Sequence, residues 1–388
     1  GSLADSGTDA RVQEPRHPPE SGMARNPNKP SWQLCCTAGG MPSERPLLLV
    51  TGSSGRIGSA VLERFAPTYQ VVGIDRVDPP EAVPEADYRI VDLTSDERVA
   101  SALTQIRAGH GSHIASVVHL AAYYDFSGEP SPKYEQVTVR GTERLLRALH
   151  PFEVEQFVFS SSMLVHAPTE PGRLITEDSP LVPRWPYPES KMSTETIVRA
   201  QHDRMPFALL RIAGVYDDEC HSIPLANQIQ RIDERRVTGK VFPGHAAHGQ
   251  AFLHVDDLVD ALARVVERRA TLPDDLVLLL GEPETLSYDE LQHTLGRLIH
   301  GEEWTTREIP KSVAKAGAWT KEIIPGEDPF IKPWMIDFAD DHYALDVSRA
   351  RALLDWEPRR SLRETLPTMV AKLKENADSW YRENGLKS

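Results

Sequence analysis

The sequence predicts a doubly wound α/β fold: a parallel Rossmann sheet with helices on both faces and a smaller, mostly helical C-terminal lobe. Three observations predict it: short continuous apolar runs, helical patterns between them, and a glycine-rich turn directly after the first run. Continuous rather than alternating apolar runs suit strands that are buried on both faces of a parallel sheet. Strands that alternate with helices then imply the doubly wound arrangement.

Six apolar runs are expected to be strands of this sheet. They are Leu47 to Val50, Val71 to Ile74, Val117 to Leu120, Phe157 to Phe159, Ala208 to Leu210 and Val277 to Leu280. A further strand, the third in chain order, is expected directly before Val91-Asp92-Leu93-Thr94. Helical patterns with apolar residues on one face lie between and after the strands. The expected helices are Ser59 to Phe65, Tyr134 to His150, Ser287 to His300, Val347 to Leu354 and Ser361 to Glu375.

The expected domains differ in composition. Residues 1–45 are rich in proline and small polar residues and have no periodic apolar pattern, so we expect a disordered tail. Gly1-Ser2 resembles a cloning scar, and Met41 is a candidate natural start. We assign 46–215 to the dinucleotide-binding domain, with 251–281 returning to it. Residues 216–250 and 282–388 are expected to form the substrate-binding lobe.

The overall composition is that of a globular protein with 40% hydrophobic and 26% charged residues among 388. A net charge of −14 argues against nucleic acid or an anionic membrane as a partner. The three cysteines form neither a disulfide framework nor a zinc motif, which favours a reducing cytoplasm and no metal. No apolar run approaches the length of a membrane span.

A glycine-rich turn, Thr51 to Gly58, follows the first expected strand. Gly52, Gly55 and Gly58 would let the chain turn sharply, bring the backbone against a pyrophosphate and pack the helix closely on the strand. The N-terminus of the next helix would then present N–H groups and partial positive charge to the phosphates. Taken alone, the motif is also compatible with a turn that binds no ligand.

Asp75 strengthens the cofactor interpretation because it ends the second apolar run. A carboxylate there can accept hydrogen bonds from the adenosine ribose and would repel a 2′-phosphate, so it favours NAD over NADP. Arg56 and Arg76 weaken this preference, since either guanidinium can pair with a phosphate. Asp92 is a candidate acceptor for the adenine amino group, and a solvated surface position is the alternative.

Several further segments follow the glycine turn along the chain. They are Val91 to Thr94, His119 to Ala122, Phe159 to Ser162, Tyr187 with Lys191, Leu210-Arg211, Phe252 to Leu258 and Leu354 to Pro358. In this order they resemble the extended short-chain dehydrogenase/reductases, specifically the NAD-dependent epimerase/dehydratase branch, over roughly residues 46–375. The resemblance implies an NAD site built from sixteen residues. These are Gly52, Ser54, Gly55, Arg56, Ile57, Gly58, Asp75, Arg76, Asp92, Leu93, Leu120, Ala121, Ala122, Ser160, Tyr187 and Lys191.

The same resemblance implies a catalytic group of Ser162, Tyr187 and Lys191. Tyr187 and Lys191 are one helical turn apart, so both face the same way. A phenol with a pKa of ~10 is a poor base at pH 7, but an ammonium about 4 Å away contributes roughly 4 kcal/mol at an effective dielectric near 20. We therefore expect a pKa near neutrality for Tyr187, suited to proton transfer. Ser162 is expected to orient the reacting oxygen, and Lys191 also to hold the nicotinamide ribose.

Two departures from the family pattern concern proton transfer. Met163 and Leu164 stand where the related sugar 4,6-dehydratases carry an Asp-Glu pair. Neither side chain can exchange a proton, so dehydration is disfavoured. Thr138 stands where the family has an asparagine that orders a proton-relay water, and the relay is therefore in doubt.

Another departure concerns the substrate. Gln250 stands where many relatives place an arginine that clamps the diphosphate of a nucleotide sugar, and an amide cannot form that charge-assisted bond. Arg231, Arg235 and Arg236 are candidate replacements. Several large apolar side chains could instead converge on an apolar pocket, although ordinary packing is the alternative for each. They are Tyr123, Tyr124, Phe126, Met163, Trp185, Trp319 and Trp334.

The leading hypothesis is an NAD-dependent oxidoreductase or epimerase that acts at a secondary alcohol or ketone of a sugar or a sugar-nucleotide-like substrate. One alternative is a dehydrogenase or reductase of a more hydrophobic, non-nucleotide alcohol or ketone. Another is a non-catalytic NAD(P)-binding sensor or scaffold, which the presence of both Tyr187 and Lys191 disfavours. By resemblance, the helices around 134–150 and 188–202 would pair across a two-fold axis in a homodimer.

Overall fold

A computed structural model describes residues 45–125, 128–202, 204–322 and 332–386, without the side chains of residues 317–322 and Pro333. Of the expected N-terminal tail, all but residue 45 lies outside the described residues. Residues 45–388 form one compact unit, and the expected division of this unit into two domains stays a prediction. Among the described residues, no helix is both long enough and apolar enough to cross a bilayer.

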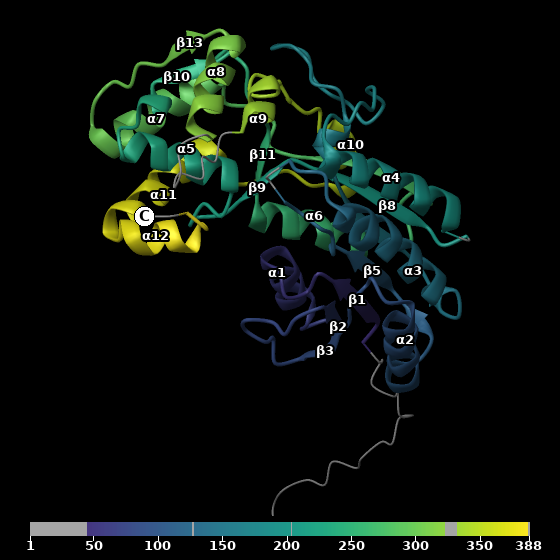
Figure 1. The fold of residues 1–388 in the computed structure, drawn as a ribbon. Coiled ribbons are helices and arrows are strands. Elements are labelled where there is room, and N and C mark those ends of the chain that lie inside the picture. Colours follow the sequence, from purple (N-terminus) through teal and green to yellow (C-terminus); the bar gives the residue numbers. More distant parts are fainter. Residues whose placement is uncertain (1–44, 126–127, 203, 323–331, 387–388) are drawn as a thin grey trace, which may run out of the picture. The chain divides into compact units, whose positions relative to one another are not determined.

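The central feature is a seven-stranded sheet with helices on both faces (Figure 1). Its strands are β1 (Leu47–Thr51), β2 (Gln70–Asp75), β3 (Ala86–Ile90), β5 (Ser116–His119), β7 (Phe157–Ser162), β8 (Phe207–Ile212) and β12 (Asp275–Leu280). The spatial order is β12-β8-β7-β5-β1-β2-β3, and all neighbouring strands are parallel. The strand order reverses between β1 and β5, and ligands bind at such a point in doubly wound sheets. The predicted fold class is confirmed.

Burial explains which strands the sequence reveals. Every residue of β1 and of β8 is buried, as expected for strands with neighbours on both sides and helices on both faces. Strand β3 lies at the edge of the sheet and its residues are only partly buried or exposed, so it carries no continuous apolar run. Only the segment that follows β3 indicated its position in the sequence.

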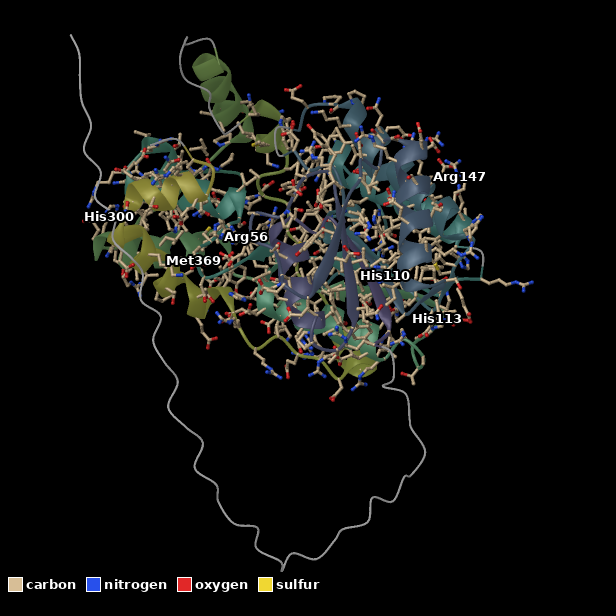
Figure 2. The ribbon with its side chains drawn as sticks, turned by 90° about the horizontal axis from the view of Figure 1, so that it is seen from below. Arg56, His110, His113, Arg147, His300 and Met369 are labelled. Atoms are coloured by element: carbon tan, nitrogen blue, oxygen red, sulfur yellow. The ribbon has the colours of Figure 1, made fainter. Side chains whose placement is uncertain are left out.

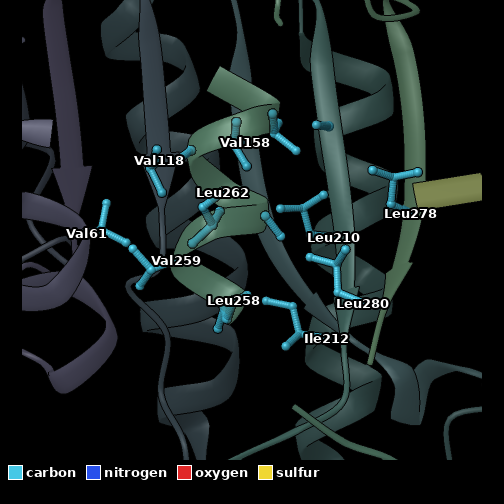
Figure 3. Packing of buried hydrophobic residues seen from close by; sticks show 14 of the residues in the cluster. Val61, Val118, Val158, Leu210, Ile212, Leu258, Val259, Leu262, Leu278 and Leu280 are labelled. Carbon is cyan, nitrogen blue, oxygen red and sulfur yellow. The ribbon is translucent and has the colours of Figure 1, made fainter. Parts of the chain in front are cut away.

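Helices α1 (Arg56–Phe65) and α6 (Val255–Glu267) cover one face of the sheet (Figure 1). Figure 3 shows Val61 of α1 and Leu262 of α6 beside Val118 and Val158 of the sheet, all of them fully buried. The opposite face packs against three helices. These are α2 (Asp96–His110), α3 (Arg140–Leu149) and α4 (Pro186–Gln201). Two hydrophobic cores therefore hold the sheet rigidly between helical layers.

The helix predicted from Tyr134 to His150 is divided in the structure. Its first part is a π-helical turn, η1 (Tyr134–Val139), and only then does α3 begin. Helix α4 starts with proline in its first turn, where the missing N–H leaves no hydrogen bond unmade.

The C-terminal part contributes a third core. Its helices are α5 (Ile223–Asp233), α7 (Tyr288–His300), α8 (Lys311–Glu322), α9 (Pro333–Asp337), α10 (Ser348–Leu354), α11 (Leu362–Glu375) and α12 (Ala377–Glu383). Buried side chains of α5, α7, α11 and α12 form this core, whereas α10 packs on the core of the sheet. Short strand pairs complete the fold. They are β9 (Gly214–Tyr216) with β11 (Phe252–His254), β10 (Val241–Pro243) with β13 (Arg307–Ile309), and β4 (His113–Ile114) with β6 (Glu153–Val154). Two single-turn 3₁₀ helices are η2 (Met163–Val165) and η3 (Val237–Gly239).

Candidate active site

The glycine turn joins β1 to α1 at the point where the strand order reverses. Gly52 has a φ of +72°, and a Cβ there would lie 2.8 Å from the backbone nitrogen of Ala121. A Cβ on Gly58 would lie 2.1 Å from the carbonyl oxygen of Gly52. The fold itself therefore requires glycine at both positions. At Gly55 the nearest atom would be 3.4 Å away, so a side chain there would fit the protein and fill the cradle in front of α1.

The N-terminus of α1 is suited to an anion. Gly55, the residue before the helix, provides no side-chain cap, and the first turn contains no acidic residue. The partial positive charge and N–H groups of such a terminus favour a phosphate. Arg56, labelled in Figure 2, begins the helix and keeps about half of its side chain exposed. Its Nη1 donates to Oδ2 of Asp217 at 3.0 Å. The residues present therefore fit the pyrophosphate of NAD.

Asp75 lies beside the glycine turn at the end of β2. Its Oδ2 accepts a hydrogen bond from the backbone nitrogen of Ser54 at 3.0 Å, and its Oδ1 accepts one from that of Arg76 at 2.7 Å. Asp92 lies in an exposed turn, where its Oδ1 accepts from the backbone nitrogen and the Oγ1 of Thr94. These bonds lower the pKa of Asp92, and its contact with adenine stays a prediction.

The segment after β5 runs along the glycine turn. The backbone nitrogen of Leu120 donates to the carbonyl oxygen of Thr51 at 3.1 Å, and that of Ala121 donates to Thr51 Oγ1 at 3.2 Å. Residues 120–122 are half-buried there. Ser160 is tied to the same strand through its Oγ, which donates to the carbonyl oxygen of His119 at 3.2 Å. These contacts bring the segments that follow β1 and β5 close to Ser160 of β7, and all three carry expected cofactor residues.

The ring of His119 links strand β1 to helix α3. It is fully buried, with Nδ1 2.6 Å from Thr51 Oγ1 and Nε2 2.8 Å from Thr142 Oγ1. Burial lowers its pKa to about 3, so the ring is neutral. Leu93 is also buried, and half-buried Ile57 packs against the core of the sheet.

Helix α4 and strand β7 bring the three expected catalytic residues together. Lys191 is buried on α4, and its Nζ donates to the carbonyl oxygen of Ser160 at 2.7 Å. The same nitrogen lies 5.8 Å from the centre of the Tyr187 ring. Ser162, at the end of β7, is hydrogen-bonded to Tyr187, which favours the phenolate. The contact between helix α4 and strand β7 therefore brings Ser162 close to Tyr187 and Lys191, although it is distant from them in the sequence.

The pKa of Tyr187 in the structure differs from the value near neutrality that we expected. Burial raises the pKa of Tyr187 to about 12, more than the hydrogen bond with Ser162 lowers it. Burial also lowers the pKa of Lys191 to about 7, against the charge of Glu195. The expected pKa considered only the lysine charge and left out the cost of desolvating the phenolate. In this arrangement the tyrosine is a proton donor at neutral pH.

The two departures near the catalytic group are visible in the structure. Met163 is buried in the core, and the backbone nitrogen of Leu164 donates to Ser162 Oγ at 3.2 Å. Thr138 is buried in η1, where its Oγ1 accepts from the backbone nitrogen of Tyr123 at 2.9 Å. That hydroxyl group is therefore already bonded, and its part in a relay stays a prediction.

Aromatic side chains gather around Tyr187. The ring centres of Tyr124 and Trp185 lie 4.9 and 5.4 Å from that of Tyr187, and Trp334 of α9 lies 5.3 Å from Trp185. We call these four residues the aromatic cluster. Tyr123 instead packs edge-on against Tyr134 at 4.9 Å. Two further candidates, Phe126 and the Trp319 side chain, lie outside the described residues.

The candidate replacements for the diphosphate-binding arginine are all engaged elsewhere. Arg231 donates to the hydroxyl of Tyr288 at 3.2 Å. Arg235 forms an ion pair with Glu302, and Arg236 forms one with Glu234. Gln250 is exposed and pairs through its backbone with Tyr343. We therefore find no arginine among these three that is held ready for a diphosphate.

Three side chains that follow β9 have the geometry of a metal site. In the described part of the chain, ligand atoms of Asp217, Glu219 and His221 all lie within 4.8 Å of one another. Asp217, however, already pairs with Arg56 at 3.0 Å and with His221 at 2.7 Å. The guanidinium neutralises this carboxylate, so we do not assign a metal to it.

Comparison with known proteins identifies the family. Residues 48–281 match the model of the NAD dependent epimerase/dehydratase family. The chain belongs to this family. It is 27% identical to UDP-glucose 4-epimerase of Mycolicibacterium smegmatis over 83% of the chain and 96% of that protein. It is 31% identical to mouse 3 beta-hydroxysteroid dehydrogenase type 7 over 71% of the chain and 78% of that protein.

A solved structure shares the fold. UDP-glucuronic acid 4-epimerase of Bacillus cereus, in complex with UDP-glucuronic acid and NAD, aligns with a TM-score of 0.62 and 20% identity. The alignment covers 85% of the chain and 99% of the epimerase. Family membership confirms the predicted family, and it confirms that the chain is an enzyme with NAD as its cofactor.

Two site residues were missed from the sequence. Glu195 lies one turn after Lys191 on α4 and is buried, and Asp217 holds Arg56 of the glycine turn. The spacing of Glu195 from Lys191 was a readable signal, because residues four apart on a helix are neighbours. Nothing in the sequence indicated that Asp217 would contact Arg56, since 161 residues separate them.

Proposed function

We propose that this enzyme transfers hydride between NAD and a secondary alcohol or ketone carbon, with Tyr187 as the acid and base. Ser162 orients the reacting oxygen through its hydroxyl. Lys191 supplies positive charge beside the tyrosine and binds the nicotinamide ribose. The observation that supports this most directly is the bond from Lys191 Nζ to the Ser160 carbonyl oxygen at 2.7 Å, which joins the strand of Ser162 to the helix of Tyr187.

The pKa values favour a defined order of proton movement. With a pKa of about 12, Tyr187 carries its proton at pH 7 and can donate it to a ketone oxygen. In the alcohol direction the phenol must lose its proton, and positive charge close to the phenolate promotes that loss. NAD, when bound, supplies the acceptor for the hydride and a positively charged ring in its oxidised form.

One experiment tests the assignment. Mass spectrometry of the purified protein should detect bound NAD, and a screen of alcohols should detect cofactor reduction or epimerised product. Tyr187→Phe should lower turnover by roughly 10²–10⁴-fold while NAD remains bound, because general acid–base catalysis contributes about that much. A Tyr187→Phe variant with native turnover would disprove the catalytic assignment. Retained NAD without net reduction favours epimerisation, and steady NADH production favours a dehydrogenase.

A sugar nucleotide is the first substrate candidate. Two of the similar proteins are a UDP-glucose 4-epimerase and a UDP-glucuronic acid 4-epimerase, both aligned over at least 83% of the chain. Met163 and Leu164, one buried and one bonded through its backbone to Ser162, offer no acid–base pair for dehydration. Epimerisation of a sugar nucleotide is therefore the reaction to test first, with UDP-glucose as the substrate.

A neutral, apolar ring alcohol is the second candidate. Within the aromatic cluster, Tyr124 and Trp185 contact Tyr187 and Trp334 contacts Trp185, so a substrate bound there meets aromatic faces. Arg184, directly before Trp185, is held by Asp341 at 2.6 and 2.7 Å and stacks on Phe338. The 31% identical relative is named as a hydroxysteroid dehydrogenase. Turnover of a 3β-hydroxysteroid without turnover of UDP-glucose would decide for this candidate.

The assembly and location are also proposed. We propose a homodimer in the cytoplasm, paired through α3 and α4. Helix α3 begins with the exposed Arg140, which pairs with Glu135 of η1 and with the half-buried Glu143 of α3. Such charges can pair across a two-fold axis. Sedimentation velocity at micromolar concentration should give the mass of a dimer, and a monomer would overturn the proposal.

A further inference from the structure

A buried carboxylate lies directly behind the catalytic group. Glu195 is 2% exposed, and its Oε1 accepts hydrogen bonds from Ser161 Oγ at 2.6 Å and from Arg211 Nε at 3.0 Å. Its Oε2 accepts from Arg211 Nη2 at 2.8 Å. None of the roles proposed above uses this cluster of three buried side chains. Such a fully bonded buried ion pair loses much of its stabilisation when one partner is removed.

The cluster joins the strand and the helix that carry the catalytic residues. Ser161 stands between Ser160 and Ser162 on β7, and Arg211 is its register partner on the neighbouring strand β8. Glu195 lies on α4, one turn after Lys191 and two turns after Tyr187. The carboxylate therefore fixes α4 on β7 at the same level at which Lys191 reaches Ser160.

Arg211 is also held by contacts outside its ion pair with Glu195. Its Nη1 donates to the carbonyl oxygen of Glu177 at 2.9 Å and lies 3.1 Å from His166 Nε2. The pKa of His166 is lowered to about 4, mainly by burial, so that ring is neutral at pH 7. With both partners held from several sides, Glu195 has one position in which its bonds are complete.

Glu195 also contributes charge to the lysine. The groups facing Lys191 are His119 of β5, Phe159 and Ser160 of β7, and Tyr187 and Glu195 of its own helix. Burial makes His119 neutral, and at pH 7 Tyr187 is neutral as well. The Glu195 charge raises the pKa of Lys191 against the effect of burial. Arg211 on β8 and Arg199 on α4, whose Nη1 lies 3.8 Å from Glu195 Oε2, offset part of that negative charge.

We propose that Glu195 is a positioning residue for hydride transfer: through Ser161 and Arg211 it holds α4 on β7, and it supplies the negative charge that faces the Lys191 ammonium. This inference rests on the proposed function for its consequence in turnover. The electrostatic part concerns the protein alone and can be measured without a substrate, whereas the geometric part is read from turnover.

The test compares Glu195→Gln with Glu189→Gln, an exposed position on the same helix. Trace labelling with acetic anhydride across pH 5–10, read by mass spectrometry, gives the midpoint at which Lys191 becomes reactive. We expect a midpoint near 7 in the wild type and a value about one pH unit lower in Glu195→Gln. The Glu189→Gln variant should match the wild type. Equal midpoints in all three proteins would overturn the electrostatic part.

Ser161→Ala tests the geometric part and remains informative if Glu195→Gln does not fold. It removes the 2.6 Å bond and keeps both charges, so the lysine midpoint should stay within about 0.3 pH units of the wild type. Turnover on the substrate found by screening should fall by about fivefold or more, with NAD affinity unchanged. Native turnover in this variant would overturn the geometric part. If Tyr187→Phe keeps native turnover, the proposed function fails, while the labelling shift in Glu195→Gln still decides the electrostatic part.

Discussion

The buried carboxyl group of Glu282 should make the free energy of unfolding depend on pH. This side chain is 3% exposed; its Oε1 accepts from the hydroxyl of Tyr216 at 2.7 Å and its Oε2 from the backbone nitrogen of Leu362 at 2.8 Å. Burial raises its pKa from 4.5 to about 7, more than these two bonds lower it. The difference corresponds to about 3 kcal/mol between the protonated and the ionised form.

The sign of the effect follows from linkage. The unfolded chain loses this proton near pH 4.5 and the folded chain near pH 7, so the folded state binds more protons between those values. The contribution of Glu282 to the free energy of unfolding therefore falls as the pH rises from 4.5 to 7. Above pH 7, where the carboxylate is ionised, this contribution is about 3 kcal/mol smaller than below pH 4.5. Glu282→Gln removes the titration and keeps the shape of the side chain.

Urea unfolding at a series of pH values measures this contribution. The difference in unfolding free energy between Glu282→Gln and the wild type should shift in favour of the variant by about 3 kcal/mol between pH 4.5 and 7.5. Glu303→Gln is the matched control, because Glu303 is exposed and pairs only at the surface with Arg297. A pH-independent difference for Glu282→Gln, equal to that of the control, would refute the reasoning.

Three further predictions concern the cofactor and the substrate. Gly58→Ala places a Cβ 2.1 Å from a carbonyl oxygen, so it should lower the free energy of unfolding by ~1–3 kcal/mol or more and abolish NAD retention. In the control Gly109→Ala the new Cβ has no atom within 4 Å, so this variant should be neutral or stabilising in thermal unfolding. Asp75→Ala should weaken NAD binding by about tenfold and reduce the preference over NADP in calorimetric titrations, with Asp78→Ala unchanged. Trp185→Ala should raise the KM of an apolar substrate at least fivefold, with Trp185→Phe close to the wild type, and equal KM values would contradict a role of the aromatic cluster in binding.

Much of the fold was predictable because its signals are local. Each of the six apolar runs lies in a strand of the sheet, except that Leu120 follows the end of β5, because strands buried on both faces consist of continuous apolar residues. The edge strand β3 has no such run. The π-helical turn η1 was predicted as ordinary helix, because side-chain periodicity does not reveal a change in backbone hydrogen bonding over six residues.

The site was predictable where residues are neighbours along one element and much less so elsewhere. Tyr187 and Lys191 share a helix, so their proximity follows from spacing. The pKa of Tyr187 does not follow from it, because burial depends on the packing of distant segments. Glu195 meets Ser161 and Arg211 from positions 34 and 16 residues away, contacts that the sequence pattern does not encode.

The hydrogen-bonded ring of His119 has a consequence for the acid–base behaviour of NAD binding. With a pKa of about 3 and both nitrogens bonded, it remains uncharged at neutral pH. Thr51, its partner, ends the strand that leads into the glycine turn. The hydrogen bond between His119 and Thr51, directly before the glycine turn, therefore does not change with pH around neutrality. Lys191, whose pKa burial lowers to about 7, titrates near neutrality, so from its proposed role at the nicotinamide ribose we expect the affinity for NAD to change around that pH.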